Sequence, residues 1–292
     1  MICTIKSEQL TVKIDTLGAE LISAVGEDGF EYIWQAPRAE LWDEHSPVLF
    51  PHCGRILNST YTLGGVTYNM GSHGFAKRSE FEVLKSTVSS VTLALYASEE
   101  TKKIYPFDFS LIAEFEVAEN RLIANFSVKN GDKKVMPYMF GWHPGFTLDT
   151  SAGHKINDFV LGFNGVKSVK WHDIINGCFV AASGVDYPLE NSAYPLCEEE
   201  IYAHDTMIFV GTNDSVSLTA DGCAHGIDMN WSNNLPYFCI WKMPTSEANY
   251  VCLEPWSNIP GEGLEAENFD TKPMSRLASG ESELYRYSIS FN

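Results

Sequence analysis

Hydrophobic and polar residues alternate along the stretch FSLIAEFEVAENRLIANFSVKN, residues 109–130. The apolar side chains occupy every second position on both sides of a polar turn at Glu119-Asn120. Side chains of a β-strand point alternately to its two faces, so this pattern predicts a β-hairpin with one buried face. Helical periodicity is nearly absent from the rest of the chain. The alternation therefore restricts the fold to one that is built mainly of β-strands.

Further short runs carry the same strand signature, and a second hairpin is predicted in YTLGGVTYNM, where the chain turns at Gly64-Gly65. One short helix is expected in PRAELWDEH, residues 37–45, and residues 184–200 are expected to form an excursion loop. The other predicted strands are LTVKID, SVTLALYA, DFVLGF, SVSLTA, YFCIWKM, NYVCLEPW and LYRYSISF.

Many short strands separated by Gly, Asn, Asp and Pro are typical of a sandwich or a barrel. No linker, repeat or low-complexity segment divides the 292 residues. We therefore predict an all-β fold, a large antiparallel two-sheet β-sandwich with few short helices, which forms a single domain over residues 1–292. Whether the protein forms a homodimer is left open by the sequence.

The formal net charge of −18 argues against binding to nucleic acids and anionic membranes, because such a surface does not neutralise phosphates. No run approaches the roughly 18 apolar residues of a membrane helix, and no signal peptide is visible, so a cytoplasmic location is expected. The seven cysteines include no C-x-x-C pair. We therefore expect free thiols, no metal site and no cofactor.

Four stretches place polar side chains that are costly to bury beside apolar, strand-like residues. These are Arg55 in VLFPHCGRILN, His73 in MGSHGFAKRSEF, His143 in FGWHPGF and Glu254 in NYVCLEPWSNIPG. Strand parity points Glu254 to the same side as Cys252. Structural roles also fit these residues: Arg55 as a loop cap, His73 as a solvent-exposed turn residue and Glu254 as a carboxylate at a sheet edge.

A histidine and a glutamate at two strand ends could form an acid–base pair. Their ordinary pKa values, about 6.5 and 4.3, allow opposite protonation states near neutral pH, especially if the carboxylate raises the imidazole pKa. Aromatic residues at Phe75, Trp142 and Trp256 could supply the apolar face of a sugar site.

Taken together and in order, these stretches resemble the aldose 1-epimerase (galactose mutarotase) family, and most closely its bacterial mutarotase-like branch. The resemblance covers nearly the whole chain and implies a very large antiparallel β-sandwich. The segments that carry it are TVKIDTLGAELISA, PVLFPHCGRILN, SHGFAK, FGWHPGF, AHDTMIFVG and CLEPWSNIPG.

The resemblance implies an isomerase that interconverts the α and β anomers of a free aldohexose without a cofactor. It makes Glu254 the general base and His143 the general acid. It makes Arg55, His73 and Asp205 the residues that hold the sugar, with the rings of Phe75 and Trp256 beside them.

Two motifs depart from the family pattern. WHPGF stands where galactose-type enzymes have a histidine followed by Thr-Tyr-Phe, so galactose is not specified as the substrate. HGFAK replaces the commoner HGFAR, and Lys77 with Arg78 could instead serve a phosphate. The alternatives are therefore a hexose-6-phosphate 1-epimerase and a non-catalytic sugar-binding or sensor protein of the same fold.

Overall fold

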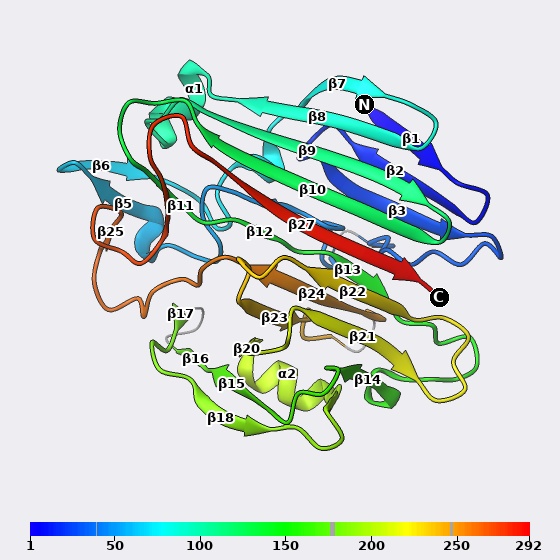
Figure 1. Ribbon diagram of the computed structural model, residues 1–292. Coiled ribbons are helices and arrows are strands. Elements are labelled where there is room, and N and C mark those ends of the chain that lie inside the picture. Colours follow the sequence, from blue (N-terminus) through cyan, green and yellow to red (C-terminus); the bar gives the residue numbers. More distant parts are fainter. Residues whose placement is uncertain (39, 176–178, 246–247) are drawn as a thin grey trace.

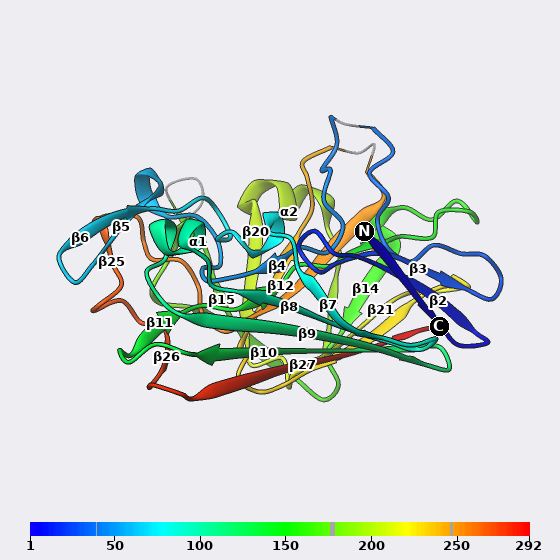
Figure 2. The ribbon, with the colours of Figure 1, turned by 90° about the horizontal axis from the view of Figure 1, so that it is seen from above.

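The computed structural model describes residues 1–38, 40–175, 179–245 and 248–292, and two large antiparallel β-sheets dominate it (Figures 1 and 2). Within the described residues, nine strands form the first sheet. Their order is β19 (Ala193–Pro195), β14 (Phe159–Gly162), β21 (Ser215–Ala220), β22 (Ile227–Trp231), β27 (Ser282–Phe291), β10 (Arg121–Asn130), β9 (Phe109–Ala118), β8 (Ser90–Tyr96) and β7 (Glu82–Ser86).

The second sheet has eight strands in the described part of the chain. One of the eight, β13 (Gly145–Thr147), is attached through its pairing with β24. The order of the others is β18 (Val185–Pro188), β15 (Ser168–His172), β20 (Thr206–Val210), β23 (Tyr237–Trp241), β24 (Tyr250–Trp256), β12 (Gly141–Trp142) and β4 (Val48–Leu49).

Smaller elements surround the two large sheets. The small sheets are β1 (Ile2–Lys6) with β2 (Leu10–Asp15) and β3 (Glu20–Gly26), β25 (Glu267–Asn268) with β5 (Thr60–Leu63) and β6 (Val66–Asn69), β11 (Met136–Tyr138) with β26 (Ser275–Leu277), and β16 (Ile174–Ile175) with β17 (Phe179–Val180). The helices are α1 (Glu99–Ile104), α2 (Glu198–His204) and the 3-10 turns η1 (Leu57–Ser59), η2 (Ala76–Arg78) and η3 (Ile156–Asp158). Among the described helices, none is long and apolar enough to cross a membrane.

The core lies between the two large sheets, and aromatic rings from both fill it. Phe126 on β10 packs against Trp142 on β12 with ring centroids 5.6 Å apart. Trp142 also contacts Tyr287 on β27 at 5.2 Å. Farther along, Trp231 on β22 stacks on Phe238 on β23 at 5.1 Å. The apolar positions of the alternating pattern thus face the opposite sheet, as a sandwich requires.

The predicted two-sheet sandwich is confirmed. β9 and β10 form the hairpin expected at residues 109–130, with Arg121 opposite Ala118, and β5 and β6 form the second hairpin. The rule of alternating side chains holds because one face of each long strand is buried and the other is not, as in β9, where every second residue is buried.

Two local predictions are wrong. The described residues of 37–45 form turns and bends instead of a helix, and residue 39 lies outside the described residues. Residues 184–200 are not a loop excursion, because they supply β18, β19 and the start of α2. Short polar strands at a sheet edge lack the apolar alternation that reveals the long central ones. The six described cysteines are free, and Cys178 lies outside the described residues.

Replacing the Phe126 ring should test this inter-sheet core. Phe126 is fully buried, so Phe126→Ala should lower the free energy of unfolding by about 3–5 kcal/mol through lost contacts and a cavity. Ser127→Ala, the next residue on the opposite face of β10, should change it by no more than about 0.5 kcal/mol. Urea denaturation followed by tryptophan fluorescence measures both, and equal effects would contradict the packing described above.

Candidate active site

Strand β24 places a carboxyl group in the middle of the second sheet. All of its residues, Tyr250–Trp256, are buried. Val251 and Leu253 belong to the inter-sheet core, whereas Tyr250 and Cys252 belong to a separate cluster on the other face. By the same alternation Glu254 points away from the inter-sheet core, with no exposed surface. The predicted direction of Glu254 is thus the direction in the structure, but the side chain is enclosed by other groups and does not face water.

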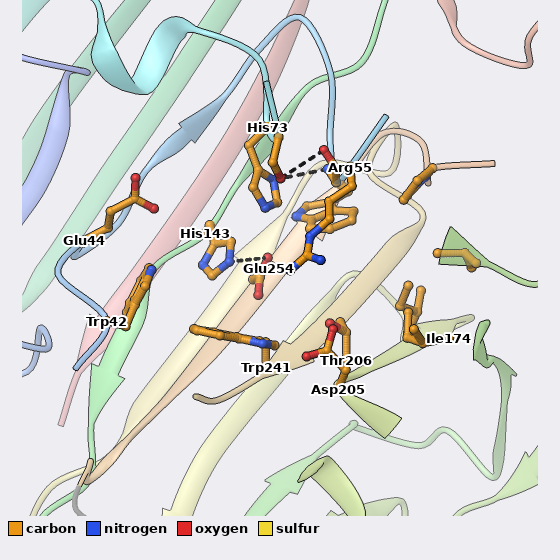
Figure 3. A pocket seen from close by; sticks show the side chains of 16 residues that line it. Trp42, Glu44, Arg55, His73, His143, Ile174, Asp205, Thr206, Trp241 and Glu254 are labelled. Atoms are coloured by element: carbon orange, nitrogen blue, oxygen red, sulfur yellow. Dashed lines mark hydrogen bonds and ion pairs between the residues drawn. The ribbon is translucent and has the colours of Figure 1, made fainter. Parts of the chain in front are cut away.

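The neighbouring strand β12 carries His143 to this carboxyl group. Gly141 pairs with Trp256 across the two strands, and the His143 amide then donates to the Pro47 carbonyl at 3.1 Å. As a result the Nε2 atom of His143 lies 3.2 Å from the Oε2 atom of Glu254, although the two residues are far apart in the sequence. The imidazole and the carboxyl group therefore form one buried pair (Figure 3).

The pair lies in the wall of a cavity of about 230 Å³. Because a liquid water molecule takes up about 30 Å³, this space suits a single sugar ring. Its described lining residues come from several loops and from β20, β23 and β24: Trp42, Glu44, Gly54, Arg55, Ser72, His73, His143, Ile174, Val180, Asp205, Thr206, Ile208, Trp241, Glu254, Trp256 and Pro260.

His73 faces the same cavity from a turn with an unusual backbone. Its φ of 63° and that of Gly74, 71°, are both positive. A Cβ atom at Gly74 would lie 2.2 Å from the Phe50 carbonyl oxygen, so glycine is required there by the close approach of two backbones rather than by a ligand.

Backbone contacts fix the tautomer of His73. The Gly54 amide donates to Nδ1 of His73 at 3.2 Å, while the His73 amide donates to the Gly54 carbonyl at 2.9 Å. Burial lowers the pKa of His73 well below its ordinary value, and the nearby His143 and Lys77 add to this effect. The ring is therefore neutral, with its proton on Nε2, where it is a hydrogen-bond donor.

Burial also decides the charge of the central pair. Loss of hydration lowers the pKa of His143 to about 3, and the charge of Lys77 acts in the same direction. Burial raises the pKa of Glu254 well above its ordinary value, the Trp256 side chain opposes this rise, and Asp205 adds to it. Neither oxygen of Glu254 accepts a well-aligned hydrogen bond from a described protein donor. Burial therefore favours the neutral pair, in which the proton between the two side chains lies on the Glu254 carboxyl group and not on the His143 ring.

A raised imidazole pKa, which would have favoured opposite protonation states, does not occur in this site. It requires a solvated pair, in which the attraction between opposite charges exceeds the cost of desolvation. In this site burial removes much of the hydration of both groups, which favours two neutral groups over an ion pair.

Arg55 and Asp205 lie at the mouth of the cavity, on opposite loops. Asp205 ends α2 with φ 60° and ψ −63°, a sparsely populated conformation that commonly marks a functional position. Figure 3 shows its carboxylate directed into the pocket beside Trp241, with the Arg55 guanidinium nearby. The structure thus brings together Arg55, His73, His143, Asp205, Glu254 and Trp256 of the predicted site.

Two predicted aromatic residues lie elsewhere. Phe75 does not line the cavity, because its ring packs against Phe50, Tyr105 and Phe109 in the core. Trp142 is fully buried between the sheets, and its indole N–H donates to the Ser46 carbonyl at 2.9 Å. Trp142 is next to His143 at the end of β12, and strand alternation turns its side chain to the other face. Phe75 lies two residues after His73, at the start of the 3-10 turn η2, where its ring enters the core.

Trp42, Glu44 and Trp241 are among the pocket residues that the sequence analysis missed. Trp42 and Glu44 belong to the segment for which a helix was expected, and the Trp42 ring lies 5.1 Å from that of His143. Trp241 ends β23 opposite Cys252, so its side chain faces the pocket. The alternation of side chains in the run YFCIW could have identified Trp241 once Glu254 was chosen. Loop residues such as 37–45 have no such periodicity, so their pocket side chains are not predictable in this way.

One group of possible metal ligands occurs among the described residues. The nitrogen of His143, the sulfur of Cys252 and a carboxyl oxygen of Glu254 lie within 4.8 Å of one another. Burial raises the pKa of the Cys252 thiol well above its ordinary value, so a metal ion would have to displace the thiol proton on binding.

Comparison with known proteins agrees with this geometry. The family model for aldose 1-epimerase matches residues 1–290. The chain belongs to the aldose 1-epimerase family. A galactose mutarotase-related enzyme of Lactobacillus acidophilus is 31% identical and superposes with a TM-score of 0.92, with 100% of this chain and 97% of that one covered.

Two further relatives belong to lactic acid bacteria. A galactose mutarotase-like protein of Lactobacillus casei ATCC 334 is 26% identical, with a TM-score of 0.92 and full coverage of both chains. Protein LacX, encoded on a plasmid of Lactococcus lactis subsp. lactis, is 29% identical over 286 residues, which cover 94% of this chain and 93% of that protein. The fold of this epimerase is therefore shared along its whole length.

His52, close to the pocket, should make this epimerase sensitive to acid. Its ring is fully buried, and burial lowers its pKa well below the ordinary value of about 6.5, with the charge of Lys272 acting in the same direction. The unfolded chain therefore binds a proton that the folded chain excludes. The stability that neutral His52 contributes is complete above pH 6.5 and is lost as the pH falls below it.

As the pH falls from 7.5 to 5, we expect the free energy of unfolding of the wild type to decrease more than that of His52→Leu. Urea titrations across this range measure it. A difference that stays constant with pH would show that His52 is protonated equally in both states.

Proposed function

We propose that this protein is an aldose 1-epimerase that interconverts the α and β anomers of a free aldohexose. The observation that carries the proposal is the contact of 3.2 Å between Nε2 of His143 and Oε2 of Glu254 in the wall of a cavity the size of one sugar. Anomer exchange requires one base and one acid side by side, and a neutral pair that shares one proton meets this requirement.

Ring opening removes the proton of the anomeric hydroxyl group, protonates the ring oxygen and breaks the bond between this oxygen and the anomeric carbon. Rotation about the next carbon–carbon bond and closure on the other face complete the exchange. We assign Glu254 as the base and His143 as the acid. In this assignment Arg55, His73 and Asp205 hold the hydroxyl groups, and the indole ring of Trp256 forms a wall of the site.

The proton on Glu254 must first move to His143, and the contact between the two residues provides the path. A bound sugar brings hydroxyl donors to a carboxyl group that has no other well-aligned donor. Hydrogen bonds to the charged form lower the pKa of a carboxyl group, so binding favours the carboxylate and the imidazolium. Glu254 then takes the hydroxyl proton while His143 gives its proton to the ring oxygen.

His73 suits the role of a fixed donor in this proposal. The Gly54 amide occupies its Nδ1 atom, which leaves the Nε2 hydrogen to point at a sugar oxygen. A donor that is held in place before the sugar binds needs no reorganisation during the reaction.

Removing either member of the pair should abolish most of the activity. Glu254→Gln and His143→Ala should each reduce the rate of mutarotation by about 10²-fold or more, because proton transfer then falls to water. Polarimetry on freshly dissolved α-glucose and α-galactose measures the rate. His154→Ala, a histidine outside the cavity, is the matched control and should keep the wild-type rate. Near-normal rates in both pair variants would contradict the assignment of Glu254 and His143, whereas a wild type that binds the sugar without accelerating mutarotation would favour a non-catalytic sugar-binding protein.

The pH profile should report the displaced pKa values. A second proton joins the pair only near the lowered pKa of His143, about 3, and the shared proton leaves only near the raised pKa of Glu254. After subtraction of the spontaneous reaction, kcat/KM should therefore stay flat as the pH falls from 7 to about 5, with no inflection near the ordinary imidazole pKa. A loss of activity with a midpoint near pH 6.5 would contradict this and indicate an ordinary, hydrated imidazole.

A further inference from the structure

A buried ion pair closes one side of the cavity. The Nζ atom of Lys77 lies 2.7 Å from Oε1 and 2.9 Å from Oε2 of Glu44. Only 10% of the Lys77 side chain and 26% of the Glu44 side chain are exposed. Glu44 is one of the residues that line the cavity (Figure 3), whereas Lys77 is not, so the carboxylate is the member of the pair that faces the cavity.

The remaining charges offer no substitute for Lys77. Arg55 is the one lysine or arginine among the described lining residues, and Asp205 faces the same space. Arg78 is exposed, and it does not line the cavity. Lys77 balances the charge of Glu44, but of these two groups only the carboxylate of Glu44 lines the cavity, on a protein whose net charge is −18. A phosphate dianion in this place would meet repulsion that its binding to Arg55 does not offset.

A hydroxyl group meets the opposite situation. A carboxylate has about four lone-pair positions, and Lys77 occupies only part of them. Glu44 can therefore still accept a hydrogen bond from a neutral sugar.

We propose that the Glu44–Lys77 ion pair makes the site selective for unphosphorylated aldohexoses and that Glu44 is the residue that rejects hexose phosphates. This inference rests on the proposed function and adds the residue that sets its selectivity. It predicts that neutralising Glu44 both removes the repulsion and releases Lys77 toward the cavity. Removing the two charges together restores the original balance.

The test compares glucose with glucose 6-phosphate for four proteins: wild type, Glu44→Gln, the double variant Glu44→Gln/Lys77→Gln, and Glu116→Gln. Glu116 is exposed on β9 in the first sheet, so its replacement changes the net charge equally but far from the cavity. Exchange between the anomeric proton signals in NMR spectra gives kcat/KM for both sugars, and thermal unfolding confirms that each variant is folded.

Glu44→Gln should raise the ratio of kcat/KM for glucose 6-phosphate over glucose by about tenfold or more, since one unit charge is removed at short range. The double variant and Glu116→Gln should stay within about threefold of the wild type. Because the effect is electrostatic, the gain should shrink in high salt. A ratio in Glu44→Gln within about twofold of the wild-type ratio would overturn the inference.

Failure of the proposed function would look different. If the wild type accelerates anomer exchange of neither sugar, the proposed epimerase function is wrong. The selectivity is then measured from the dissociation constants of glucose and glucose 6-phosphate by NMR titration. The same tenfold shift in relative affinity in Glu44→Gln supports the inference, and an unchanged ratio rejects it.

Discussion

The site depends on the burial of one carboxyl group. Glu254 lies in a strand that is paired on both sides, by β23 on one and by β12 and β13 on the other, so no sheet edge admits water to it. A carboxylate without hydration or donors is costly, and the cost is avoided here when Glu254 keeps a proton. His143, 3.2 Å away, is kept neutral by the same burial. The chemistry that we propose is thus a consequence of where β24 runs.

The sandwich explains how such a position is held. The first sheet covers one face of β24 with aromatic side chains, and this packing leaves the other face free to form the floor of a cavity. Trp34, Leu41 and Trp42 fold over part of that face and form a second, small cluster with Tyr250 and Cys252. Loops that carry binding residues are therefore supported by a rigid sheet, which fixes the positions of the reacting groups before a sugar enters.

Periodic features of the sequence predicted the structure well. The β9–β10 hairpin and the direction of Glu254 follow from a local rule, the alternation of side chains in a strand. The helix expected at residues 37–45 failed because a loop that packs through Trp42 has apolar residues without a period. Phe75 and Trp142 were chosen for their rings alone, and a ring beside a site serves the core equally well.

The pKa of His143 marks the limit of that reasoning. Residue types predict a proton shared by an acid and a base, but the atom that carries it depends on how many water molecules the folded chain excludes. That number is a property of the whole enclosure, to which β24, β12 and the loop with Trp42 all contribute. Two neutral groups are cheaper to bury than an ion pair, yet they differ from it by one proton moved over 3.2 Å. The neutral pair is stable without a ligand. A ligand with hydroxyl groups supplies the hydrogen bonds that stabilise the carboxylate and the imidazolium. The polarity of the substrate is therefore linked to the chemistry that we propose.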